Sequence, residues 1–268
     1  MITSLSNPKI KMLMQLQKKA KTRREEQRFV VEGIKMVLEA PADRVCCLFV
    51  SSAFAEKDKN MPAVEKKAAE AGIHIEVVED KIFRDISDTM TPQGVMAVIK
   101  MEPWDWKQLL VQKKSGSGLY IVLETLQDPG NLGTILRTGE GAGIDGVILN
   151  RTSADPYMPK VIRSTMGSIY RMPIAVADDL GEVLRVMKTR GIRIFAAHLK
   201  GEKNYDKQDY RGDTCFMIGN EANGLSDALA DMATDYIKIP MAGHVESLNA
   251  GIAAALLMYE AGRQRDFK

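Results

Sequence analysis

The sequence has few of the residues that build metal centres and disulfide frameworks. Of its 268 residues, three are histidine and three are cysteine. Cys46 and Cys47 are adjacent and do not readily bridge to each other, and any pairing among three thiols leaves one over. No Cys-x-x-Cys spacing occurs, so the sequence predicts no metal site and no disulfide framework.

Long hydrophobic runs are also missing. No apolar stretch approaches the roughly 18 residues of a membrane span, and the N-terminus has no apolar core of a signal peptide. Hydrophobic residues make up 45% of the chain and charged residues 27%, a balance typical of folded globular proteins. We therefore expect a cytoplasmic protein of one or two domains with no membrane partner.

Charge of one sign does not dominate the chain, because the net charge is only +2. The first 30 residues differ, since they contain eight basic residues and only two acidic ones, Glu25 and Glu26. Such a run attracts phosphate groups of nucleic acids, although from charge alone we favour a solvated helix face. The basic residues are Lys9, Lys11, Lys18, Lys19, Lys21, Arg23, Arg24 and Arg28.

Apolar periodicity predicts two α/β domains. In residues 1–100, a basic helical segment (2–28) precedes strands at 29–31, 45–50, 73–78 and 95–99, with helices at 33–40 and 61–71. Residues 101–118 form a polar, glycine-containing linker. In residues 119–268, we expect strands at 119–123, 146–149, 192–197, 215–218 and 236–239, and helices at 132–142, 180–190 and 247–263.

Three glycine-containing loops follow predicted strands of the second domain. Loops after parallel strands meet at one sheet edge and form ligand sites. The first loop (124–133) contains Asn131, a good helix N-cap, and leads to Arg137. Arg137 follows Gly133 at helical i, i+4 spacing, so both share one helix face. Its guanidinium could bind a phosphate through two hydrogen bonds, or simply pair with an acid.

The second loop (218–226) and the third loop (237–249) add further candidates. Glu221 could be a base, a backbone cap or a subunit contact, and we favour a structural role. The third loop ends where the last helix begins, so free backbone amides are available there. Ser247 is the expected N-cap and Asn249 falls in the first turn, although both could be plain capping residues. His244 is a further acid–base candidate.

Taken together, these segments resemble the SpoU (TrmH) family of the SPOUT superfamily. The matching residues are Asn131-x-Gly133-x-x-x-Arg137, Gly219-x-Glu221-x-x-Gly224-Leu225, and Ile239-Pro240-Met241 followed by Ser247-Leu248-Asn249. The intermediate segment 163–168 also looks like the family's. Residues 7–11 and 29–33 resemble the substrate-binding domain of the ribosomal-RNA branch, which looks like ribosomal proteins that grip RNA turns.

The resemblance implies a parallel sheet with a deep trefoil knot in the C-terminal domain, and a homodimer formed through that domain. It implies S-adenosylmethionine as cofactor and transfer of its methyl group to a ribose 2′-hydroxyl of structured RNA, with ribosomal RNA favoured. By position, the implied cofactor contacts are Gly219, Ile239, Met241 and Leu248. The implied catalytic-site residues are Asn131, Arg137, Glu221, Ser247 and Asn249.

Direct transfer needs no metal, because the sulfonium methyl is already electrophilic and alignment lowers the barrier. The family's proposed base is Arg137, yet a guanidinium is seldom neutral, so we favour an anchor for the phosphate beside the target ribose. Transfer RNA methylation and a non-catalytic ribosome-assembly role are the alternatives. A nicotinamide enzyme does not fit, because the glycine-rich segment 139–143 follows a helix and precedes a strand.

Overall fold

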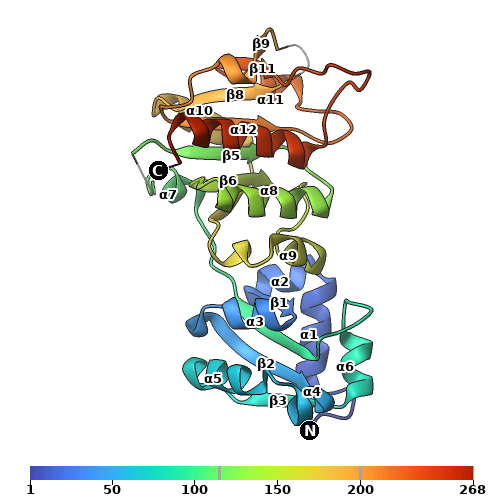
Figure 1. Cartoon of the computed structure of the whole chain (residues 1–268). Helices are drawn as coiled ribbons and strands as arrows, with labels where there is room; N and C mark the ends of the chain where they lie inside the picture. Colours follow the sequence, from blue (N-terminus) through green and yellow to red (C-terminus); the bar gives the residue numbers. More distant parts are fainter. Residues whose placement is uncertain (114–115, 199–200, 268) are drawn as a thin grey trace. The chain divides into compact units, whose positions relative to one another are not determined.

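The computed structural model describes residues 1–113, 116–198 and 201–267, which fold into two compact units (Figure 1). The first unit comprises Met1–Glu102 and Asp155–Tyr170, and the second comprises Pro103–Ala154 and Arg171–Lys268. The chain therefore passes from one unit to the other three times. Lys114 and Ser115, within the expected linker, lie outside the described residues.

The first unit is built on a four-stranded sheet with the order β1-β4-β2-β3. Strand β4 is antiparallel to both β1 and β2, whereas β2 and β3 are parallel. The strands are β1 (Arg28–Glu32), β2 (Val45–Ser51), β3 (Ile75–Val78) and β4 (Val95–Lys100). The helices of its N-terminal part are α1 (Pro8–Lys18), α2 (Ala20–Glu26), α3 (Ile34–Glu39), α4 (Ser52–Lys57), α5 (Met61–Ala71) and α6 (Asp80–Ile86).

The basic N-terminal segment forms two helices instead of the single one expected. Asn7 caps α1 by accepting a hydrogen bond from the Lys9 amide, and Lys19 adopts an extended conformation that separates α1 from α2. Ile10, Leu13 and Leu16 of α1 are buried in the core of the unit. Of the eight basic side chains, only Arg23 is buried, and the other seven are exposed.

Residues 155–170, here called the inserted segment, belong to the first unit although they follow β6 (Gly146–Asn150) of the second. The segment contains α9 (Pro159–Thr165). The ring of Tyr157 lies 5.1 Å from that of Phe29, and the buried Tyr170 hydroxyl donates to the Met36 carbonyl over 2.8 Å. The expected second domain, residues 119–268, included this segment, so its place in the first unit is a difference from the sequence analysis.

The second unit contains a seven-stranded sheet with the order β7-β6-β5-β10-β8-β11-β9. All its strand pairs are parallel, which confirms the predicted α/β fold with a parallel sheet. Parallel strands are buried on both faces, and β5 and β10 are buried along their whole length. The strands are β5 (Leu119–Leu123), β6 (Gly146–Asn150), β7 (Ile174–Ala177), β8 (Arg193–Ala197), β9 (Lys203–Asn204), β10 (Thr214–Ile218) and β11 (Asp235–Lys238).

Helices pack around this sheet. Leu184 and Met187 of the amphipathic helix α10 (Leu180–Thr189) join Tyr120 of β5 in one apolar cluster. Helices α8 (Pro129–Gly141) and α12 (Ala250–Gln264) contact each other (Figure 1). The unit also holds the short helices α7 (Trp106–Leu109) and α11 (Asp227–Ala230). Among the described residues, no helix has the length and apolar character needed to cross a bilayer.

The place of the inserted segment can be tested at Tyr170. Burial raises the pKa of Tyr170, so its hydroxyl keeps the proton that it donates to Met36. In Tyr170→Phe, the buried Met36 carbonyl loses its partner, which should cost roughly 1–2 kcal/mol. We expect thermal unfolding of the first unit to shift down by a few degrees. Tyr205→Phe, at a partly exposed tyrosine of the second unit, is the control. An unchanged midpoint in Tyr170→Phe would contradict the contact.

Candidate active site

A cavity of about 610 Å³ lies in the second unit, where its three loops meet. Strands β5 and β10 are parallel neighbours, so the loops after their carboxyl ends start side by side. The volume falls within the range of small-molecule sites, roughly 300–1,000 Å³. Eight of the nine predicted site residues line it, namely Asn131, Gly219, Glu221, Ile239, Met241, Ser247, Leu248 and Asn249.

The carboxylate of Glu221 joins the second loop to the first. It accepts hydrogen bonds from the backbone amides of Gln127 (3.1 Å) and Asp128 (2.9 Å), and from Nδ2 of Asn131 (3.0 Å). Burial alone would raise the pKa of Glu221, but these hydrogen bonds together lower it. The carboxylate is therefore charged at neutral pH and engaged by three donors, which makes it a clamp and a poor proton acceptor.

Asn131 and Asn249 form a pair of amides at the cavity. Nδ2 of Asn249 donates to Oδ1 of Asn131 over 2.7 Å, while Nδ2 of Asn131 donates to Glu221. The polar groups of Asn131 are thus satisfied at a position only 8% exposed. Glu221, Asn131 and Asn249 come from three different loops or helix starts, and this chain of hydrogen bonds holds them together.

The helix caps beside the cavity differ from those expected. Asp128 caps α8 by accepting from the Asn131 amide over 2.8 Å, so Asn131 lies inside the first turn and is not the N-cap. Asn249 caps α12 by accepting from the amides of Gly251 and Ile252, and Ser247 does not cap it. Both helices start at a different residue from the one expected. Because Asp128 caps α8, the side chain of Asn131 is free of that role and its Nδ2 donates to Glu221.

The second loop turns back tightly on itself behind Gly219. The backbones of Asn220 and Gly224 exchange two hydrogen bonds of 2.9 and 2.8 Å, and Gly224 has a positive φ of 70°. A methyl group on Gly219 would lie 2.1 Å from the Gly224 carbonyl carbon. No side chain fits there without moving the backbone, so glycine at 219 is a steric requirement of this loop.

Arg137 is the predicted site residue that does not line the cavity. Six residues after Asn131, it lies about 120° away around the helix, and its side chain is exposed. In residues 1–113, 116–198 and 201–267, no group forms a hydrogen bond or ion pair with it. Gly133, which was expected to share its face, is buried.

The histidine that lines the cavity is His198, which sequence reasoning did not single out, whereas His244 is exposed and does not line it. His198 directly follows β8, and its ring lies edge-on to that of Tyr236 at 5.5 Å. A rule that scores every polar residue after a predicted strand would have found it. Asp128 and Glu246 also line the cavity and were not predicted.

Comparison with known families identifies the family of this chain. The SpoU rRNA methylase family profile matches residues 118–259, just over half of the chain. The chain belongs to the SpoU rRNA methylase family. Residues 7–97 match a second profile, the MRM3-like substrate-binding domain. As a SpoU methylase, the chain is an RNA methyltransferase that depends on S-adenosylmethionine.

Similar proteins cover nearly the whole chain. An uncharacterised tRNA/rRNA methyltransferase of Synechocystis is 32% identical over 98% of this chain and 94% of its own length. The 23S rRNA (guanosine(2553)-2′-O)-methyltransferase RlmP of Bacillus subtilis is 29% identical over 96% and 97%. The structure of an AdoMet-bound rRNA methyltransferase from Sinorhizobium meliloti has a TM-score of 0.85 at 31% identity, covering 98% of this chain and 97% of that one.

The steric requirement at Gly219 gives a direct test of the site. In Gly219→Ala, the added methyl group must displace the Gly224 backbone, so we expect calorimetry to show at least a tenfold loss of S-adenosylmethionine affinity. Gly212→Ala is the matched control, because a methyl group there meets nothing within 4 Å. Equal affinity of the two variants would contradict the assignment of this cavity to the methyl donor.

Proposed function

We propose that this SpoU methylase transfers a methyl group from S-adenosylmethionine to a ribose 2′-hydroxyl of ribosomal RNA, in the cavity of its second unit. The observation that carries the proposal is the convergence of all three loops on one cavity, tied together by Glu221. The parallel sheet brings these loops to one edge, and the motif residues that they carry are the ones that line the cavity.

The residues at the cavity fit the methyl donor. Ile239, Met241 and Leu248 offer apolar surface for an adenine ring, and the tight turn at Gly219 brings backbone groups to the wall. The carboxylates of Glu221 and Glu246 also line the cavity and suit a cationic ligand. We therefore assign Gly219, Ile239, Met241 and Leu248 to cofactor binding.

Catalysis in this cavity is mainly positioning. The bound cofactor supplies an electrophilic methyl group, so the protein must align the ribose oxygen with it and exclude competing water. We assign this alignment to Asn131, Ser247 and Asn249, with Asn131 and Asn249 held by Glu221. Glu221 itself is a clamp, because its three donors stabilise the charged form. Arg137 anchors the phosphate next to the target ribose.

The first unit is the part that holds RNA. It exposes seven Lys and Arg side chains on α1, α2, β1 and the residues between them, of which Lys9 and Lys21 also pair with acids. Exposed basic side chains bind phosphate backbones without regard to sequence. The match of residues 7–97 to a substrate-binding domain supports this role. We further propose that the second unit contains the family's deep trefoil knot, supported by the place of β10 between β5 and β8.

A second copy of the chain completes the site in this proposal. Arg137 is exposed on α8, which contacts α12. On α12, Ile252 and Tyr259 are 50% and 46% exposed, and their i, i+7 spacing puts them on one helix face. An apolar face beside an arginine that has no partner among the described residues fits a twofold interface. We propose a homodimer in which Arg137 of each subunit serves the cavity of the other.

The reaction is tested with the purified full chain, labelled S-adenosylmethionine and a 23S ribosomal RNA transcript made in vitro, which carries no modifications. We expect label in a ribose 2′-O-methyl nucleoside, identified by mass spectrometry after digestion. Asn131→Ala, which removes the amide between Glu221 and Asn249, should lower the rate at least tenfold. Label on a base, or none under conditions where the cofactor binds, would refute the proposed reaction.

The contribution of Arg137 across the dimer is tested by complementation. Arg137→Ala and Asn131→Ala should each be nearly inactive alone. Co-expressed, they form heterodimers with one complete site, and random pairing predicts about a quarter of the wild-type rate. A mixture no more active than either variant, although mass analysis detects the heterodimer, would show that Arg137 does not act in the partner's cavity.

A further inference from the structure

The inserted segment is fastened to the first unit at its N-terminal end by a buried ion pair. Arg23, only 3% exposed, donates from Nη2 and Nε to Oδ2 of Asp155 over 2.6 and 2.9 Å. Its Nη1 donates to the carbonyls of Leu16 and Gln17 over 2.6 and 2.9 Å. Arg23 thus joins the end of α1 to the first residue of the segment. A buried charge with all its partners satisfied holds a fixed geometry.

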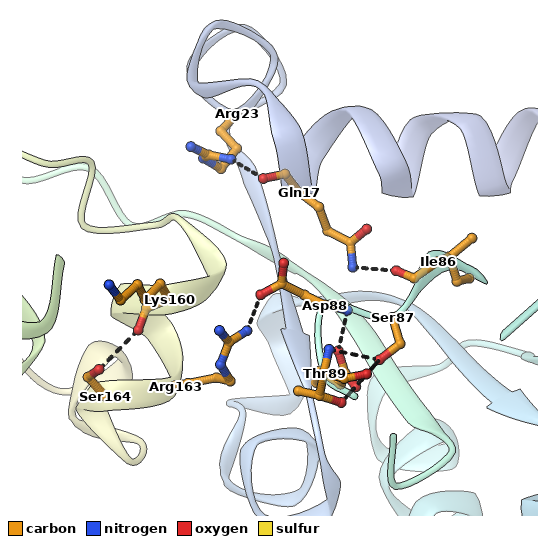
Figure 2. A network of polar contacts seen from close by, with 10 residues as sticks. Gln17, Arg23, Ile86, Ser87, Asp88, Thr89, Lys160, Arg163 and Ser164 are labelled. Atoms are coloured by element: carbon orange, nitrogen blue, oxygen red, sulfur yellow. Dashed lines mark hydrogen bonds and ion pairs between the residues drawn. The ribbon is translucent and has the colours of Figure 1, made fainter. Parts of the chain in front are cut away.

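A second ion pair fastens the middle of the segment. Figure 2 shows Arg163 of α9 directed at Asp88. The backbone of Asp88 is itself fixed, because its amide donates to Glu32 over 3.1 Å, and the hydroxyls of Ser87 and Thr89 donate to the same carboxylate. The segment is therefore held at Asp155, at Arg163 and, through its hydroxyl, at Tyr170.

Residues just before the segment are fastened to the first loop. The Ala154 amide donates to the Leu126 carbonyl over 2.8 Å, and the Leu126 amide donates to Oγ of Ser153 over 3.1 Å. Oδ1 of Asn150 accepts from the Thr125 amide over 2.9 Å. Thr125 has a left-handed φ of 53°, a conformation that a non-glycine residue keeps only when its surroundings hold it. The end of β6 thus sets the path of the first loop.

The first loop is in turn the part that Glu221 clamps. The amides of Gln127 and Asp128, one and two residues after Leu126, donate to Glu221. A continuous path of covalent and hydrogen bonds therefore runs from Arg23 through Asp155 and the first loop to Glu221. It ends at the two asparagines of the cavity.

We propose that the inserted segment couples RNA binding by the first unit to methyl transfer in the cavity of the second. Arg23 and Asp155 are its positioning residues. The inference rests on the proposed function. The peptide bond between Ala154 and Asp155 joins the residues held by the first loop to those held by Arg23. Extra flexible residues at that bond would uncouple the first loop from the first unit without breaking a contact inside either unit. Small misplacements far from the reacting atoms can cost about 10²-fold in rate.

The test is an insertion of Gly-Gly between Ala154 and Asp155 in the full-length protein. We expect a single-turnover methylation rate on the 23S transcript at least tenfold below wild type, with S-adenosylmethionine and RNA affinities within twofold. The matched control inserts Gly-Gly between Glu102 and Pro103, another crossing between the units, and should keep the wild-type rate within twofold. The wild-type protein, assayed in parallel, must methylate the transcript, so failure of the proposed function is seen separately.

Point variants provide a second measurement. Arg163→Gln removes a half-exposed ion pair, which contributes little to stability, and we expect a lower rate at unchanged affinities. Lys67→Gln, also in the first unit, removes a cation that binds the Ala40 carbonyl away from the segment and should keep the wild-type rate. A wild-type rate in the 154/155 insertion, an equal loss in both insertions, or loss of cofactor binding would each overturn the proposal.

Discussion

One carboxylate joins the segments that line the candidate site. Glu221 accepts hydrogen bonds from two backbone amides and one side-chain amide of the first loop and α8, and through Asn131 it reaches Asn249 at the start of α12. The first of these segments lies 90 residues before Glu221 and 118 before Asn249, and the hydrogen bonds hold all three at one sheet edge. Hydrogen bonds to a charged acceptor are stronger than neutral ones, and here three of them share one carboxylate. The cavity wall has its shape because this charge is satisfied.

Most strands could be predicted from the sequence because each is a short apolar run bounded by polar or glycine residues, but β7 and the two-residue β9 were missed. The predicted strand 119–123 agrees with β5, and the helix 61–71 with its glycine stop agrees with α5. Strand order could not be predicted, because it depends on contacts between distant segments. Capping failed where two good candidates lay close together, since Asp128 competes with Asn131 and Asn249 with Ser247. At α8 the side chain of Asn131 bonds to Glu221, whereas at α12 the same residue, Asn249, caps the helix and bonds to Asn131.

In the candidate site too, the sequence did not reveal contacts between distant segments. Motif residues identified eight cavity-lining positions, because loops after parallel strands must converge. Arg137 was matched by its motif, but its motif carries no information about which way its helix faces. His198 lines the cavity from a strand end that no motif marked. Arg23 looked like one more cation of a basic run, and only the fold reveals that it is buried against Asp155.

The inserted segment also has a consequence for synthesis. The first unit needs residues 155–170 for its own core, because Tyr157 packs on Phe29 and Tyr170 binds Met36. N-terminal domains usually fold first as the chain leaves the ribosome. Here the N-terminal unit cannot be complete until Tyr170 has emerged, when β5 and β6 of the second unit are already made. The first unit can therefore close only after part of the second unit has been synthesised, and the second unit in turn needs the chain as far as α12.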